Sequence, residues 1–569
     1  MTAFLIENMA PLMFASLIVV MLLGYPVAFA LGAVGIGFGL LGIELGLLQA
    51  TLFQALPERI WGVMSNDTLL AIPFFTFMGL ILERSGMAED LLETIGQLFG
   101  PVRGGLAYAV IFVGALLAAT TGVVAASVIS MGLISLPIML RYGYDRRFAS
   151  GVIAASGTLA QIIPPSLVLI IMADQLGKSV GDMYAGAFIP GITLAGLYAT
   201  YTMGVCVVKP SWAPALPVEA RTLKEPNGDT GTRSLLVLFA LSVVVAVAFA
   251  KWYYPPDAPL DELIVVATSV GTAFAYFAAL IGKLLKLKVF SRLAERVVFV
   301  LIPVLALIFL VLGTIFLGVA TPTEGGAMGA TGALTMALAR NRLSWKLLKQ
   351  GMDTTAKLTA FVVFILVGAR VFSLTFYGVN GHVWVEHLLS NLPGGQLGFL
   401  IVVNILIFFL AFFLDFFELS FIIVPLVGPV ADKLGIDLIW FGVLLGVNMQ
   451  TSFMHPPFGF ALFYLRSVAP AKDYLDKITG KLTAKITTGQ IYWGAVPFVI
   501  IQIIMIALVI MFPQMVMVYK AGEVATDPNK FEIIIPPEDA PAGNSYGQPS
   551  PSPAEPQTQD TTKEAAPTK

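Results

Sequence analysis

The sequence predicts an all-α polytopic membrane protein with about twelve transmembrane helices and two re-entrant helical hairpins, arranged as an inverted repeat. An apolar composition, a series of long apolar segments and an internal repeat lead to this prediction. Hydrophobic residues make up 57% of the 569 positions and charged residues only 12%, with a mean hydropathy of +0.86. Since soluble domains carry about 25% charged residues, the lipid bilayer is the expected surroundings of this chain.

The remaining composition excludes several classes of protein. The 33 Lys and Arg residues nearly balance the 35 Asp and Glu residues, so nothing indicates binding to nucleic acid. The single cysteine, Cys206, excludes an internal disulfide framework. The sequence contains neither a P-loop nor an HExxH motif, so we expect no enzyme and no cofactor. Residues 1–11 carry no Lys or Arg, which favours a first membrane helix over a cleaved signal peptide.

Twelve apolar segments are each long enough to span a bilayer, which takes about 20 residues. They lie near residues 8–24, 26–44, 66–82, 148–175, 183–208, 233–252, 260–282, 297–318, 322–339, 355–380, 438–465 and 490–519. Two further apolar stretches, 105–138 and 396–431, are too long for one ordinary span and have TTG and LDFFE near their middle. We expect each to be a re-entrant hairpin whose tip is buried in protein. A tilted, kinked helix is the alternative.

An internal repeat divides the chain. When the sequence is shifted by 292 residues, five ordered anchors coincide without a gap: Pro137 with Pro429, Gly143 with Gly435, Asp145 with Asp437, Pro164 with Pro456, and Pro165 with Pro457. The two halves are therefore predicted at 8–208, with hairpin 105–138, and at 297–519, with hairpin 396–431. Segment 209–296 carries two extra spans between the halves. The acidic, Pro-rich tail 520–569 is expected to be disordered.

The basic loops predict the orientation, because short loops rich in Lys and Arg face the cytoplasm. Loops 283–296, 340–349 and 466–489 are predominantly basic, and 141–147 carries three arginines and one aspartate. The loop that the repeat pairs with the last, 432–437, is acidic and should lie on the opposite side. Both termini are then outside, and the halves have opposite topology. This is a plan of secondary transporters, whose sites lie near the midplane at discontinuous helices.

Binding chemistry is expected where the helices break. Freed carbonyl groups can coordinate a cation there, and the positive end of a half-helix favours an anion. The candidates in the first half are Thr120, Thr121, Gly122, Gly157, Thr158, Pro164, Pro165 and Ser166. Those in the second half are Asp415, Glu418, Asn448, Gln450, Thr451, Pro456, Pro457 and Gly459. The alternative is that these prolines and glycines only kink packed helices, and that Asp415 only stabilises a hairpin tip.

The same regions carry a family resemblance. The stretches LLAIPFFTFMGLILERSGM, GGLAYAVIFVGALLAATTGVVAAS, GYDRRFASGVIAASGTLAQIIPPS, GVATPTEGGAMGA and LGIDLIWFGVLLGVNMQTSFMHPPFG resemble the large membrane subunit of tripartite ATP-independent periplasmic (TRAP) transporters. This implies an elevator-type transporter of the bacterial inner membrane, driven by a sodium gradient. It also implies two partners, a small four-helix membrane subunit and a periplasmic solute-binding protein that delivers an organic acid.

The resemblance assigns roles to the candidates. The implied substrate-binding residues are Thr120, Thr121, Gly122, Ser166 and Gly459. The implied sodium-binding residues are Thr121, Gly157, Thr158, Pro164, Asp415, Asn448, Gln450, Thr451 and Pro456. Two departures from the family pattern leave the coordination open: Thr121-Gly122 stands where Gly-Ser is common, and His455 stands where Thr is common. A third, the additional segment 209–296, suggests a subgroup with an unusual scaffold or partner interface. The alternatives are a single-component ion-coupled carboxylate carrier and a membrane scaffold without transport.

Overall fold

The structure is a computed structural model that describes residues 2–518 except 122–123, 224, 226–230, 256–259, 287–288, 391, 457–458 and 477, with the side chains of Thr120 and Thr121 also outside it. The predicted tail 520–569 therefore lies outside the described residues. In the part that the structure does describe, the only strands are β1 (Tyr474–Leu475) and β2 (Leu482–Thr483), which form one short antiparallel hairpin, and all other regular elements are helices.

The first half of the chain forms a run of helices that ends with one long helix. Its elements are α1 (Thr2–Glu7), α2 (Met9–Leu22), α3 (Val27–Glu44), η1 (Ala50–Ala55), α4 (Leu56–Met64), η2 (Asp67–Leu70), α5 (Ala71–Arg84), α6 (Met87–Phe99), α7 (Gly105–Thr121), α8 (Val124–Arg141), α9 (Arg146–Thr158), η3 (Leu159–Gln161), α10 (Leu167–Leu176) and α11 (Val180–Val208). The inserted segment follows with η4 (Pro210–Trp212), η5 (Val218–Ala220), α12 (Thr232–Tyr253) and α13 (Leu260–Leu284).

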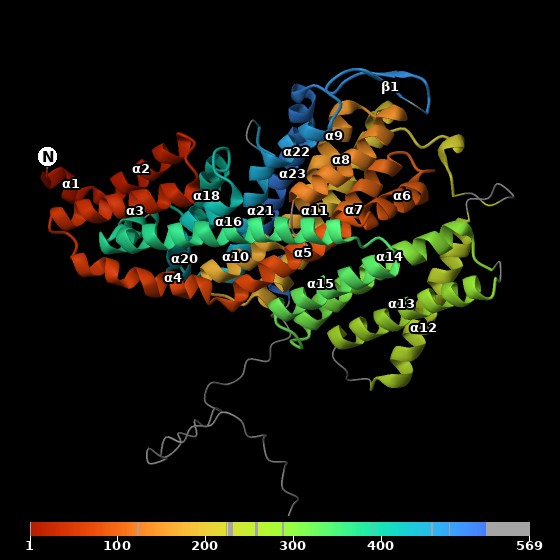
Figure 1. Ribbon diagram of the computed structural model, residues 1–569, viewed down its shortest axis with the longest axis horizontal. Coiled ribbons are helices and arrows are strands. Elements are labelled where there is room, and N and C mark those ends of the chain that lie inside the picture. Colours follow the sequence, from red (N-terminus) through yellow and green to blue (C-terminus); the bar gives the residue numbers. More distant parts are fainter. Residues whose placement is uncertain are drawn as a thin grey trace, which may run out of the picture. The chain divides into compact units, whose positions relative to one another are not determined.

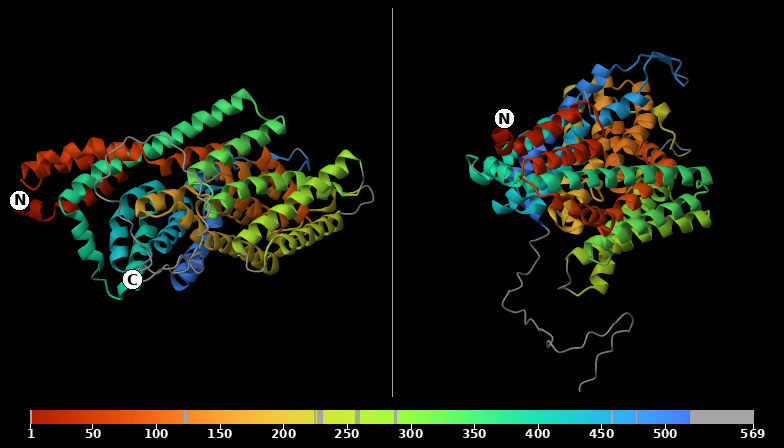
Figure 2. Two further views of the ribbon diagram at one scale, coloured as in Figure 1. Left: turned by 90° about the horizontal axis from the view of Figure 1, so that it is seen from below. Right: turned by 60° about the vertical axis from the view of Figure 1, so that its left-hand side comes forward.

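The second half repeats much of this order. Its elements are α14 (Arg292–Phe316), α15 (Pro322–Ala339), α16 (Trp345–Gly378), α17 (Gly381–Ser390), α18 (Gly395–Leu410), α19 (Phe416–Glu418), η6 (Leu419–Ile423), α20 (Val424–Lys433), α21 (Leu438–Met449), η7 (Gln450–Phe453), α22 (Phe460–Val468), α23 (Thr488–Met511) and α24 (Gln514–Met517). Figure 1 shows the helices of both halves interleaved in one bundle. In the views of Figure 2, α12 and α13 (yellow-green) lie at one edge, beside α14 (green).

Both long apolar stretches fold back on themselves. The backbone N–H of Leu106, at the start of α7, donates to the Tyr144 hydroxyl at 3.3 Å, just beyond the end of α8. In the second half the Gln396 side chain, at the start of α18, donates to the Leu434 carbonyl at 2.7 Å, just beyond α20. Both bonds join residues 38 positions apart. Neither stretch is therefore a single tilted helix.

The same residue signals produce the turn after each hairpin. Gly143 and Gly435 adopt φ of +83° and +74°, a left-handed conformation that favours glycine. Two residues later Asp145 and Asp437 cap α9 and α21, because each carboxylate accepts two backbone N–H groups of the first turn. The anchors that define the repeat are thus the residues that end one helix and begin the next.

Contacts between the halves are reciprocal. Helix α3 of the first half packs on α16 of the second, and α15 of the second packs on α5 of the first. In the same way, α10 contacts α20 and α21, and α22 contacts α8 and α9. Glycines allow the closest crossings, where helix backbones meet. A Cβ atom on Gly151 of α9 would lie 2.1 Å from the Gly494 carbonyl oxygen of α23, so neither position has room for a side chain. The half-helices after each break are therefore held by the opposite half of the chain.

Helix length and composition identify fewer membrane crossings than the twelve predicted. Among the described residues, seven helices are long and apolar enough to cross a membrane, or nine if two bent pairs each count as one span. Helix α2 and the separate pieces of the broken segments 148–175 and 438–465 are too short on their own. The prediction of twelve crossings therefore stays a prediction, as does their inverted orientation.

Several elements differ from the prediction. Helix α16 begins at Trp345, ten residues before the predicted start at 355, because Ser344 caps it and its first turns carry Lys346 and Lys349, which an apolar criterion leaves out. Helix α6 was not expected. It is amphipathic, with Leu91, Leu92 and Ile95 buried and acidic residues in its first turn, so it has no continuous apolar run.

Candidate functional site

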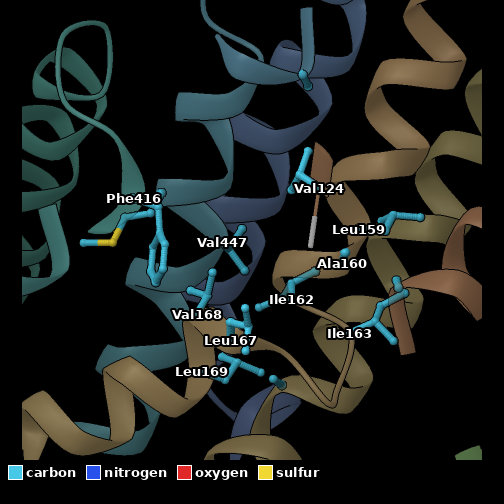
Figure 3. Close-up of a cluster of buried hydrophobic side chains, with 14 of the residues drawn as sticks. Val124, Leu159, Ala160, Ile162, Ile163, Leu167, Val168, Leu169, Phe416 and Val447 are labelled. Atoms are coloured by element: carbon cyan, nitrogen blue, oxygen red, sulfur yellow. The ribbon is translucent and has the colours of Figure 1, made fainter. Parts of the chain in front are cut away.

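The first helix break lies between α9 and α10. Helix α9 tightens into η3 and ends, and α10 begins only at Leu167, with Pro164 and Pro165 between them joined by a cis peptide bond. Ser166 is the N-cap of α10, because its hydroxyl accepts the N–H of Leu169. Figure 3 shows apolar side chains around this break, among them Ile162, Ile163 and Leu167. Helix α8 of the first hairpin contacts η3, and η6 of the second contacts α10, so both hairpins reach the break.

The second break, between α21 and α22, is more crowded. The His455 ring is 1% exposed and stacks on Phe412, with ring centres 4.1 Å apart and planes inclined by 9°. Gly459 follows, and its N–H donates to the His455 carbonyl oxygen at 2.6 Å. A Cβ atom at Gly459 would lie 2.6 Å from the Phe453 carbonyl oxygen. This part of the chain therefore folds tightly on itself and accepts only glycine at 459.

The two breaks meet through one side-chain hydrogen bond. The Gln450 Nε2 atom donates to the Thr158 hydroxyl at 3.0 Å, and the two residues are 292 positions apart, which is the shift of the repeat. Residues that a two-fold relation exchanges can touch each other only close to its axis. Thr158 and Gln450 therefore mark the centre of the two-fold arrangement, and both are fully buried or nearly so.

Three buried oxygens on the residues at or near the ends of α9 and α21 are unpaired in the described part of the chain. Gln450 Oε1, Asn448 Oδ1 and Ser156 Oγ are buried and have no hydrogen-bond partner among the residues that the structure describes. The Asn448 amide instead donates to both the main-chain carbonyl and the side-chain oxygen of Asn404, at 2.8 and 2.9 Å. Leaving a buried polar group unpaired costs about 1–3 kcal/mol. Each of these three oxygens can therefore accept a further partner.

The tip of the second hairpin has a different construction. Asp415 and Glu418 form a capping box at the start of α19, in which each side chain accepts the backbone N–H of the other, at 2.9 and 2.8 Å. Such a box satisfies the free N–H groups at a helix start. The structure thus shows Asp415 in the tip-stabilising role, and its role as a sodium ligand stays a prediction.

The other predicted residues lie at or beside the breaks. Gly157 packs against α8 so closely that a Cβ atom would come within 2.3 Å of the Val128 side chain. The Thr451 hydroxyl donates to the Asn448 carbonyl oxygen at 2.7 Å. Pro456 lies between His455 and the undescribed residues 457–458. Gly122, Pro457 and the side chains of Thr120 and Thr121 lie outside the described residues, so their placement stays a prediction.

Sequence reasoning missed four buried polar residues near the centre. Asn404 accepts the Asn448 amide, Ser156 lies beside Gly114 of α7, and the Gln502 amide donates to the Tyr198 hydroxyl at 3.1 Å between α23 and α11. The shift of 292 that pairs Thr158 with Gln450 also pairs Ser156 with Asn448, so the repeat contained the signal for Ser156. Asn404 was detectable as an isolated polar residue within an apolar helix.

No group of three or more His, Cys, Asp or Glu side chains within the described ranges can hold a metal ion. The polar groups at the contact between the two breaks are hydroxyl, amide and carbonyl oxygens. Such oxygens suit hard cations and give no site for soft transition metals.

The fold and this site define an all-helical, multi-pass membrane protein built around two broken helices. Residues 14–515 match the family described as "Tripartite ATP-independent periplasmic transporter, DctM component". The chain belongs to this family of TRAP large membrane subunits, as the resemblance predicted. Its relatives are transporter permeases and not enzymes.

Named relatives have similar lengths. The C4-dicarboxylate TRAP transporter large permease protein DctM of Rhodobacter capsulatus is 26% identical over 80% of this chain and 89% of its own. The sialic acid TRAP transporter large permease protein SiaM of Vibrio cholerae is 24% identical over 86% of this chain and 93% of its own. Among solved structures, the Alcanivorax borkumensis YdaH transporter aligns with a TM-score of 0.47 at 15% identity, over 82% of this chain and 90% of that one. That similarity is too low to establish a common fold.

Proposed function

We propose that this chain carries an organic acid into the bacterial cell together with sodium ions, as the large subunit of a three-part system in the inner membrane. Its proposed partners are a small four-helix membrane subunit and a periplasmic solute-binding protein that delivers the acid. The family is tripartite by description, and relatives are named for C4-dicarboxylates, sialic acid and isethionate. Acids of this kind are the proposed substrate class.

The observation that carries the proposal is the contact between the two breaks, where the Gln450 amide donates to the Thr158 hydroxyl and Gln450 Oε1 stays unpaired among the described residues. Asn448 Oδ1 and Ser156 Oγ, each two residues earlier on its own helix, are buried and likewise have no hydrogen-bond partner there. A sodium ion takes oxygen ligands and would satisfy these groups. Sodium ligands of this proposal also include Thr158, Thr451 and carbonyls freed beside the breaks.

Sodium would also make the substrate easier to move. An uncompensated carboxylate in an apolar barrier costs several kcal/mol or more. Bound cations at the breaks offset that charge, and the N-termini of α10 and α22 add the positive ends of two half-helix dipoles. Cation and anion therefore bind more favourably together than apart, which is the physical basis of coupling.

An elevator movement fits the reciprocal packing. The hairpins and broken helices hold one another across the halves, since α10 contacts α20 and α21 while α22 contacts α8 and α9. A second set, α3 with α16 and α5 with α15, pairs in the same crosswise way. We infer that the first set moves as one body against the second and carries the site across the membrane.

Uptake into proteoliposomes tests the proposal. The purified chain is reconstituted with its small subunit, a solute-binding protein and a radiolabelled C4-dicarboxylate or sialic acid, with and without an inward sodium gradient. We expect saturable uptake only when all three proteins and the sodium gradient are present. Saturable uptake by the chain alone would instead support the single-component carrier, and no uptake with any acid would support a scaffold.

A further inference from the structure

A basic pocket lies where the inserted segment meets the second half. Helices α13, α14 and α15 lie side by side (Figure 1) and, with α6, enclose a cavity of about 600 Å³. Five basic side chains line it, against two acidic ones, Asp90 and Glu295. The basic residues are Lys283, Arg292, Arg296, Arg340 and Arg342.

The positive charge of this pocket is only partly neutralised. Asp90 pairs with three arginines, with N–O distances of 2.7 Å to Arg342, 3.2 Å to Arg340 and 3.7 Å to Arg296, and Arg296 pairs more closely with Glu93 at 3.1 Å. The Glu225 carboxylate accepts the backbone N–H of Arg292 at 2.6 Å. The side chains of Lys283 and Arg292 form no ion pair among the described residues, and the Lys283 ammonium lies 4.8 Å from the centre of the Phe299 ring. The pocket therefore carries a net positive charge that favours an anion.

An apolar groove continues from this pocket. A second cavity of about 660 Å³ runs between α14 and α15, and Pro303 and Met336 line both cavities. The groove passes Leu307 and ends near Leu310 on α14, which an α-helical rise places about 10 Å further along the helix than Pro303. Its lining is almost entirely apolar, apart from Thr331 and Thr335.

We propose that the basic pocket and the apolar groove together bind one anionic phospholipid, with its phosphate headgroup beside Lys283 and Arg292 and an acyl chain along α14 and α15. A free phosphate would make no use of the groove, whereas a phospholipid needs both parts. The basic loops 283–296 and 340–349 are predicted to face the cytoplasm, where the leaflet is rich in anionic lipids. Basic pockets between membrane helices on that side bind such headgroups. The inserted helix α13 completes the site by supplying Lys283 and Tyr276.

Native mass spectrometry of the full-length chain in detergent tests the headgroup. Phosphatidylglycerol and phosphatidylcholine with identical acyl chains are added in turn. We expect phosphatidylglycerol to bind at least about tenfold more tightly, since each basic residue near a membrane surface favours an anionic lipid about fivefold. The double variant Lys283→Gln/Arg292→Gln should lose this preference. The matched control Lys346→Gln/Lys349→Gln removes two exposed charges from the start of α16, outside the pocket, and should keep it.

The groove has its own test. Thr331→Trp fills it with a large side chain at an exposed position, and should weaken the binding of long-chain phosphatidylglycerol while short-chain phosphatidylglycerol binds as before. Unfolding temperatures of all variants report whether they fold. Equal binding of the two headgroups, or an unchanged preference in the folded Lys283/Arg292 variant, would overturn the proposal. Displacement of the lipid by millimolar inorganic phosphate would show a simple anion site, and displacement by the small membrane subunit would show a protein interface.

Discussion

The two broken helices share a frame but differ at the break itself. Asp145 and Asp437 cap α9 and α21 with the same pair of backbone hydrogen bonds. At the ends of those helices, however, the first half has the short hydroxyl of Thr158 and the second half has the long amide of Gln450. The caps and turns kept the geometry of the repeat, while the residues at the centre diverged.

The two halves differ in the same way at a second pair of positions. Ser156 in the first half corresponds to Asn448 in the second, again a hydroxyl against an amide, and both leave an oxygen unpaired. Similar caps and turns therefore precede unlike polar side chains, and at both positions the longer side chain comes from the second half.

The largest expected effect concerns Gln450 and Thr158. Gln450→Leu removes an acceptor oxygen and leaves Thr158 without its donor, so we expect the sodium concentration for half-maximal uptake to rise about tenfold or more, as for a buried polar group left unpaired. Thr158→Val should have a smaller effect of the same sign. The measurement is uptake at a series of sodium concentrations in proteoliposomes.

The double variant Thr158→Val/Gln450→Leu is the control, because the two effects should not add when the side chains touch. Expression and unfolding temperature should stay near those of the unmodified chain. Sodium-independent uptake that follows a proton gradient and disappears in His455→Gln would contradict sodium coupling, and would make the buried histidine the coupling residue.

Because the second break is crowded, we expect alanine to destabilise the protein at Gly459 but not at Gly196. Gly459→Ala places a Cβ atom 2.6 Å from the Phe453 carbonyl oxygen, and we expect a loss of about 1–3 kcal/mol in the free energy of unfolding. The control is Gly196→Ala on α11, where a Cβ atom has no neighbour within 4 Å. Thermal unfolding in detergent compares the two, and equal unfolding temperatures would show that the break can relax.

Variants of Asp415 can distinguish a helix-capping role of this side chain from a role as sodium ligand. Asn is as good an N-cap as Asp, whereas Ala loses about 1 kcal/mol. If Asp415 serves the capping box alone, Asp415→Asn keeps both stability and sodium dependence, and Asp415→Ala lowers only the stability. A raised sodium requirement in a stable Asp415→Asn variant would instead make the carboxylate a sodium ligand.

The smallest expected effect is at the mouth of the first hairpin, where Arg141 donates to Asp476 at 2.7 Å. This hydrogen bond holds the pKa of Asp476 well below its usual range. A carboxyl group with a lowered pKa stabilises the folded state above its unfolded pKa of about 3.9, and loses that contribution as the pH falls toward the folded value. The unfolding temperatures of the unmodified chain and Asp476→Asn should therefore differ slightly and equally from pH 5 to 9, and converge only in stronger acid.

The sequence alone predicted most of the helices because apolar length is the dominant signal in a membrane chain. It also located the breaks, since proline pairs and Gly-x-Asp turns act locally on the backbone. It could not predict α6, whose apolar residues are periodic and not continuous, or the ion pairs of Asp90 with arginines of the second half. Those depend on which helices meet, and the pattern along one helix does not contain that information.

For the candidate site, the sequence likewise predicted which residues belong to it but not which residues they contact. Thr158, Asn448 and Gln450 were expected from their positions at the breaks, but their hydrogen bonds depend on the distance between two helices far apart in the chain. The stacking of His455 on Phe412 was equally inaccessible, because it joins the second break to the end of α18. Local signals identified the members of the site, and tertiary packing decided their partners.

The glycine crossing of α9 and α23 has a consequence for biosynthesis. Gly151 belongs to the first half, but α23, which covers it, is the last long helix of the described residues to leave the ribosome. Thr158 likewise has no Gln450 partner until 292 further residues have been translated. The packing of the first half is therefore completed only when α23 has been made, and a chain truncated before α23 would expose its glycine faces to cellular quality control.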